Sequence, residues 1–74
     1  MTAQEKITKI LQQLKDGKIL YFSTSLRVIK VKQKDVDKFE AIGRALFKAS
    51  NNSMFISSGK KYVCIDYCQI TVEG

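Results

Sequence analysis

Alternating lysines mark the segment of this chain that is best suited to binding an anion. Lys30, Lys32 and Lys34 are each separated by one residue. In an extended strand such residues lie on one face about 6.6 Å apart, where their ammonium groups can meet successive phosphates. Lys18 and Arg27 extend the set. We therefore expect one continuous positive surface formed by these residues, although lysines on an edge strand also serve to prevent aggregation.

Aromatic residues precede these lysines in the sequence. Tyr21 and Phe22 belong to an apolar segment that we expect to pair with the lysine-rich one. Exposed aromatic rings beside a basic groove are typical of proteins that bind single-stranded nucleic acid, because bases stack on the rings. Tyr21 is therefore a candidate binding residue together with the lysines.

A second basic segment surrounds Gly59. Its sequence, Ser57-Ser58-Gly59-Lys60-Lys61, offers backbone amides and two ammonium groups to a phosphate. The segment lacks the full glycine-rich spacing of a phosphate-binding loop, whereas Ser58-Gly59 fits the centre of a two-residue hairpin turn. We favour the hairpin turn and keep Lys60 and Lys61 as candidate nucleic-acid contacts.

Residues for catalysis or metal binding are scarce in this sequence. Histidine is absent, and Cys64 and Cys68 are the only thiols. On one strand the two cysteines lie about 13 Å apart, too far for a shared metal or a disulfide. We interpret them as packing residues, with an intersubunit contact or a reactive thiol as the alternative. Asp66 has no catalytic partner nearby in the sequence, and we interpret it as a solvent-facing or salt-bridged residue. We therefore expect no enzyme activity, no cofactor and no metal site.

The net charge of +6 is confined to the first 34 residues, which carry eight basic residues and two acids. Residues 35–74 carry five of each. This asymmetry indicates a polyanionic or acidic partner.

The 74 residues predict a single small basic domain, 1–74. The longest apolar run has four residues and the first residues are polar, so we expect a cytoplasmic protein without membrane contact.

The first half of the chain predicts one helix and two strands. Thr2 and Glu5 form a capping box, and Gly17 is suited to end the helix that follows. Helical and then alternating apolar patterns predict a helix over residues 3–16 and strands over residues 19–23 and 26–32. The segment between the two strands, Ser23-Thr24-Ser25, is either a hairpin turn or part of one long bent strand.

The second half predicts a helix and two more strands. Asp35 is the expected N-cap of a helix over residues 36–50, which Asn51-Asn52 end. Gly43 lies on the apolar face of that helix and is interpreted as a close-packing residue. The remaining strands are expected over residues 53–57 and 61–72, with a bulge or a break near Gln69.

These elements predict an α+β fold in the order α-β-β-α-β-β. We expect one four-stranded, mostly antiparallel sheet with both helices packed on one face. The order resembles the opening of the double-stranded-RNA-binding domain, although the third strand and the Lys-rich final helix of that family are missing from the matching positions. The expected core consists of Ile7, Leu11, Leu14, Phe39, Ile42, Leu46 and Ile65.

A small non-enzymatic binding protein is the class that these features favour. The first hypothesis is binding of the DNA or RNA backbone through the basic strand. The alternative is a protein-interaction module, such as a regulator or inhibitor that docks on an acidic surface of a larger host complex. Size, charge and the lack of catalytic groups resemble the small accessory proteins of phages and plasmids. The apolar segment 62–74 also predicts a homodimer, formed by pairing of strand edges or sheet faces.

Overall fold

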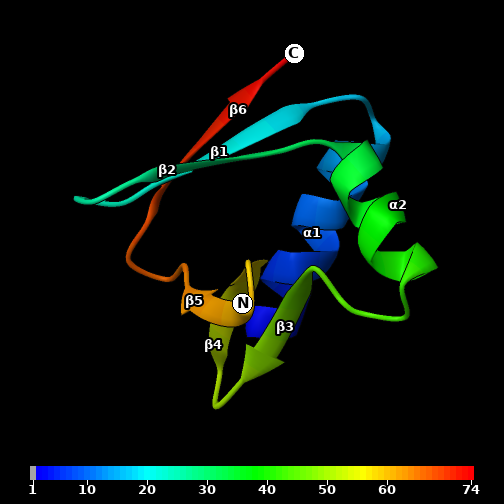
Figure 1. Ribbon diagram of the computed structural model, residues 1–74. Helices are drawn as coiled ribbons and strands as arrows, with labels where there is room; N and C mark the ends of the chain where they lie inside the picture. The colour runs from blue at the N-terminus through cyan, green and yellow to red at the C-terminus, as the bar shows by residue number, and fades with distance from the viewer. Residues whose placement is uncertain (1) are drawn as a thin grey trace.

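The computed structural model describes residues 2–74, which form two helices and six strands (Figure 1). In chain order these elements are α1 (Ala3–Lys15), β1 (Ile19–Ser23), β2 (Val28–Val31), α2 (Gln33–Ala41), β3 (Phe47–Ser50), β4 (Ser53–Ser58), β5 (Lys61–Cys64) and β6 (Gln69–Glu73). The strands make two antiparallel three-stranded sheets, β2-β1-β6 and β3-β4-β5. The α+β class is confirmed, whereas the single four-stranded sheet with both helices packed on one of its faces is wrong.

The helix α1 begins and ends where its sequence signals predict. The Thr2 Oγ1 accepts a hydrogen bond from the Glu5 amide at 3.2 Å and donates one to the Glu5 carboxylate at 3.2 Å. At the other end Gly17 has a φ of +88°, and the amides of Gly17 and Lys18 donate to the carbonyls of Leu14 and Gln13. This pair of bonds is the Schellman closure, which favours glycine at the left-handed position.

The helix α2 ends at Ala41, so the predicted helix over residues 36–50 is wrong beyond that residue. Gly43 has a φ of +73°, and the Gly43 and Arg44 amides donate to the Glu40 and Phe39 carbonyls at 3.0 and 2.8 Å. Gly43 therefore closes the helix as Gly17 closes α1, and it is not an interior packing residue.

The start of α2 also differs from the prediction. Lys32, rather than Asp35, is the N-cap residue. Asp35 instead lies in the first turn, where its carboxylate accepts a hydrogen bond from the Lys32 amide at 2.8 Å. A complete capping box has two hydrogen bonds, but the lysine side chain has no acceptor for the second one. Only the bond from the N-cap amide to the Asp35 carboxylate is therefore made.

The second sheet is a meander with two tight turns. Asn51 and Asn52 have φ values of +50° and +59° and connect β3 to β4, as a type I′ turn requires. Gly59, with a φ of +65°, and Lys60 connect β4 to β5. The predicted hairpin turn is therefore confirmed, with its centre one residue later than Ser58-Gly59. The strand β3 was not predicted, because residues 47–50 were assigned to the second helix.

The first sheet pairs the first strand of the described chain with the last one. The strand β1 occupies the predicted residues, and its pairing with β2 confirms the hairpin rather than a long bent strand. The turn spans residues 24–27, so the predicted strand over residues 26–32 is wrong at both ends, because β2 is Val28–Val31. The predicted strand over residues 61–72 is interrupted, because a turn from Ile65 to Cys68 separates β5 from β6. The second piece, β6, pairs with β1, so that Leu20 lies opposite Val72 and Phe22 opposite Ile70.

One apolar core lies between the sheets and α1. The Phe22 ring of β1 meets the Phe47 ring of β3 edge to face at 5.8 Å between centroids, which joins the two sheets. Of the expected core residues, Ile7, Leu14, Leu46 and Ile65 are buried, and Leu11 and Phe39 are half-buried. Ile42 is 59 % exposed, because it follows the last residue of α2. Within residues 2–74, neither helix is long and apolar enough to cross a membrane.

Candidate functional site

Three of the predicted lysines line one hollow. Lys18 comes from the turn after α1, Lys32 precedes α2, and Lys34 lies in its first turn. With Gly17, Gln33 and two apolar side chains they surround a volume of about 330 Å³. Among residues 2–74, no acidic side chain lines it. We call this site the lysine hollow.

The lysine hollow is not the flat row of alternating lysines that the sequence predicts. The strand β2 ends at Val31, and α2 begins two residues later. Lys34 is therefore helical, and only Lys30 of the three lysines lies within the strand. What brings Lys18 to Lys32 and Lys34 is the Schellman turn at Gly17, which leads the chain from α1 into the strand beside β2.

Lys30 lies beside Tyr21 on the outer face of the first sheet. The two residues are opposite each other in the β1–β2 pair, and the Lys30 Nζ is 6.0 Å from the ring centroid. A hydrogen bond with Glu73, together with burial and the charge of that carboxylate, raises the pKa of Tyr21. This face therefore combines one cation, one phenol and one acid. Phe22 is fully buried, so the expectation that it offers a stacking surface is wrong.

Arg27 belongs to a different part of the surface. Its guanidinium donates a hydrogen bond to the Ser58 hydroxyl at 3.2 Å, next to the turn that carries Lys60 and Lys61. The strand β2 lies between Arg27 and Lys32, and five extended residue steps place the two residues about 17 Å apart. The predicted binding residues thus form two groups rather than one continuous surface.

A larger hollow contains residues that the sequence did not single out. Arg44, Ser57, Lys60 and Tyr62 line a volume of about 670 Å³ together with Gly43, Ala45 and Gly59. We call it the tyrosine hollow. Arg44 and Tyr62 were missed because residues 44–50 were assigned to a helix, which hides the pairing of β3 with the strands that follow.

The cysteines and Asp66 hold the loop between β5 and β6. The Asp66 carboxylate accepts from the Met54 amide, with both oxygens at 3.2 Å, and the Cys64 thiol donates to it at 3.6 Å. The Cys68 Sγ lies 3.9 Å from the Cys64 carbonyl, so the predicted 13 Å separation along one strand is wrong. Burial, and then the nearby Cys64 and Asp66, raise the pKa of Cys68. Asp66 is exposed, which agrees with the solvent-facing alternative, and these contacts also give it a structural role.

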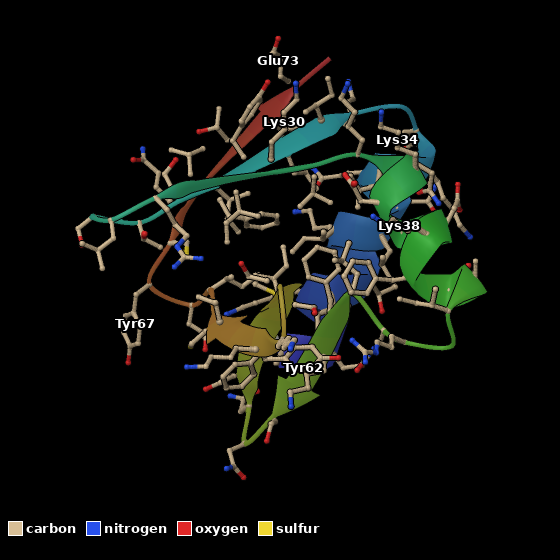
Figure 2. The ribbon with its side chains drawn as sticks, viewed as in Figure 1. Lys30, Lys34, Lys38, Tyr62, Tyr67 and Glu73 are labelled. Carbon is tan, nitrogen blue, oxygen red and sulfur yellow. The ribbon has the colours of Figure 1, made fainter. Side chains whose placement is uncertain are left out.

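The two hollows lie at opposite ends of α2. The lysine hollow includes the residues at the start of the helix, and the tyrosine hollow includes the residues just after its end. Figure 2 shows Lys34 and Lys38 along α2 and Tyr62 on the second sheet. Both hollows have cationic linings, and within residues 2–74 neither lining includes an acid.

Comparison of the chain with known protein families, curated proteins and solved structures gives no match. Its function must therefore be inferred from its own residues.

Proposed function

We propose that this protein binds nucleic acid and that the lysine hollow holds the phosphate backbone. The observation that supports this is that Lys18, from the turn after α1, lines one hollow with Lys32 and Lys34, from the start of α2, without an acidic lining residue among those described. Like charges gathered in this way repel one another and oppose the compact state. A bound polyanion removes that repulsion, so the arrangement favours a phosphate-rich partner.

The chemistry of the hollow suits contact with the backbone rather than with base edges. Lysine ammonium groups are compact point charges that neutralise phosphates and release condensed counterions. The Lys32 amide is already bonded to the Asp35 carboxylate, so the positive charge comes from the ammonium groups, of which the Lys18 Nζ also donates a hydrogen bond to the Gly74 carbonyl at 3.4 Å. Contacts of ammonium groups with phosphates position a nucleic acid without reading its sequence, so we expect similar affinity for different sequences.

The test compares salt dependence in two triple variants. Lys18→Ala, Lys32→Ala and Lys34→Ala together remove the lysine hollow, and Lys6→Ala, Lys9→Ala and Lys15→Ala remove equal charge from exposed positions of α1. Fluorescence anisotropy with labelled oligonucleotides over a range of salt gives the slope of log K against log salt.

Each phosphate contact contributes about 0.9 to this slope, so the first variant is expected to lower it by about two to three units. The α1 variant is expected to lower it by less than one unit. If the two variants bind alike, or if the wild-type chain has no affinity at low salt, the proposal is wrong.

A second candidate function is docking on an acidic protein surface. Ile70 and Val72 of β6 are 40 % and 43 % exposed, and with Ile10 and Met54 they line a hollow of about 280 Å³. Lys6 and Lys9 also line this hollow, which gives it an apolar floor with basic side chains. Such a groove matches an apolar peptide segment with acidic residues.

One pair of substitutions separates the two functions. Ile70→Ser with Val72→Ser removes the apolar floor and leaves all the lysines in place. Nucleic-acid binding that survives this change but not loss of the lysine hollow supports the first function. The predicted homodimer remains a prediction, to be tested by light scattering at high protein concentration.

A further inference from the structure

The ring of Tyr62 is held in a fixed position at the surface of the second sheet. Its hydroxyl donates a hydrogen bond to the Ala45 carbonyl at 2.9 Å. The Lys48 Nζ lies 4.1 Å from the ring centroid, and Lys48 is not among the residues that line the tyrosine hollow. The side chain nevertheless remains 39 % exposed. A ring fixed in advance binds a flat ligand at a lower entropic cost than a mobile one does.

The rest of the hollow suits an anion. Arg44, Lys60 and Ser57 are the charged and hydroxyl-bearing residues of its lining, and Arg44 also lines a neighbouring hollow together with Glu40. Gly43 and Gly59 line the hollow with backbone atoms only. There is open space where a side chain would project from either residue. The volume of about 670 Å³ lies within the range of about 300–1,000 Å³ that is usual for small-molecule sites.

An aromatic ring beside two cations matches a ligand that combines a flat ring with a phosphate. We propose that the tyrosine hollow binds one nucleotide unit, with the base against Tyr62 and the phosphate between Arg44 and Lys60. A base paired inside a duplex cannot leave its stack without energetic cost, so this site selects single-stranded nucleic acid. The selection of single strands rests on the function proposed above, whereas binding of a free nucleotide does not.

The position of the two hollows allows one strand to occupy both. They are separated by α2, which has nine residues and is therefore about 13 Å long. Lys34 and Lys38, one helical turn apart, place two cations on that helix, which also carries Asp35, Asp37 and Glu40 (Figure 2). A strand with its backbone in the lysine hollow can follow these residues to the tyrosine hollow. We therefore expect an oligonucleotide that spans α2 to bind more tightly than a mononucleotide.

The first test replaces the ring. Tyr62→Leu removes the stacking surface, and Tyr67→Leu is the matched control, because Tyr67 is 95 % exposed on the loop after β5. The probes are adenosine monophosphate, adenosine, an oligo(dA) strand long enough to span α2, and a duplex of similar length. Loss of one base–aromatic stack is expected to weaken oligo(dA) binding by about tenfold or more. Duplex binding, and all binding by Tyr67→Leu, is expected to stay within about twofold of wild type.

The second test removes the charge and leaves the ring. Arg44→Ala with Lys60→Ala changes two exposed side chains, so the fold is retained even if Tyr62→Leu fails to fold. This variant is expected to lose adenosine monophosphate binding and to leave the already weak binding of adenosine unchanged. Circular dichroism and a thermal melt confirm that each variant is folded.

The outcomes separate this proposal from the previous one. Suppose that Tyr62→Leu and Arg44→Ala with Lys60→Ala both bind oligo(dA) as tightly as wild type, while the lysine-hollow variant does not. This result overturns the nucleotide site and supports backbone binding. Binding of adenosine monophosphate that requires Arg44 and Lys60, without any affinity for oligonucleotides, supports the site and overturns the nucleic-acid function. Absence of binding to every probe overturns both.

Discussion

The two sheets contain strands of similar length but are assembled from different parts of the chain. The sheet β3-β4-β5 uses residues 47–64, and each strand is joined to the next by a two-residue turn. The sheet β2-β1-β6 pairs Ile19 with Glu73 and Ser23 with Gln69. The first arrangement depends on local turn residues, whereas the second combines the local hairpin of β1 and β2 with a β1–β6 pair that closes a long loop of chain. The two sheets therefore respond to different kinds of substitution.

The aromatic contact between the sheets provides the strongest test of that difference. Phe22→Ala removes a fully buried ring of β1 that packs against Phe47 of β3. We expect a loss of about 3–5 kcal/mol in the free energy of unfolding, because the deletion leaves a cavity between the sheets. Urea denaturation measures it, followed by a probe on each sheet. If the second sheet keeps its stability while the first unfolds, the sheets are independent units and the shared core is contradicted.

The loop between the sheets is expected to have the next largest effect. Asp66→Ala removes the carboxylate that accepts from the Met54 amide and positions the chain between β5 and β6. We expect a loss of about 1–2 kcal/mol, since a hydrogen bond to a charged acceptor is lost at a partly exposed site. Asp37→Ala, on the exposed side of α2, is the control and is expected to change stability by less than about 0.5 kcal/mol. Equal effects of the two substitutions would contradict the structural role of Asp66.

The helix end that leads into the second sheet should be sensitive to the choice of residue. Gly43→Ala places a side chain at a φ of +73°, which we expect to cost about 1 kcal/mol. Gly43→Asn is expected to cost less, because asparagine tolerates this conformation better. Thermal denaturation compares the two variants with wild type. A stabilising Gly43→Ala would indicate that α2 continues past Ala41 in solution.

The smallest expected effect concerns Tyr21 on the outer face of the first sheet. Hydrogen bonding to Glu73, burial and the charge of Glu73 raise the pKa of Tyr21 in the folded chain. The folded state therefore keeps the phenolic proton to higher pH than the unfolded state, and this contribution to stability is lost as the pH rises above about 10. Glu73→Gln is expected to lower the pKa toward its ordinary value, as measured by phenolate absorbance. The Tyr21→Phe variant identifies the signal of this residue, and an unchanged titration after Glu73→Gln would contradict the contact.

The parts of the fold that could be predicted have local signals. Thr2, Glu5 and Gly17 delimit α1 correctly because caps and the left-handed glycine act within a few residues of the helix. The end of α2 was missed although Gly43 gives the same signal. Leu46 and Phe47, which belong to the core through the next segment, happen to continue the helical spacing of Val36 and Phe39. Periodicity alone cannot show that the backbone has already turned.

The candidate site could be predicted in composition but not in arrangement. The sequence identifies Lys18, Lys32 and Lys34 as candidate binding residues. They lie together because α1 ends at Gly17 and β2 ends at Val31, and not because they alternate along one strand. The tyrosine hollow needs β3 beside β4 and β5, so no pattern within one segment contains it. Pairing of distant strands, as for β1 with β6, leaves only a weak trace such as the interruption near Gln69.

The pairing of β6 with β1 also sets an order of events during synthesis. The residues of β1, β2 and the whole second sheet are all synthesised before residues 69–73. At a synthesis rate of about 5–20 residues per second, several seconds pass between the synthesis of β1 and that of β6. During that time one edge of β1 has free amide and carbonyl groups, which can pair with another chain. A ribosome that pauses before Gln69 therefore prolongs the period in which this protein is most exposed to misassembly.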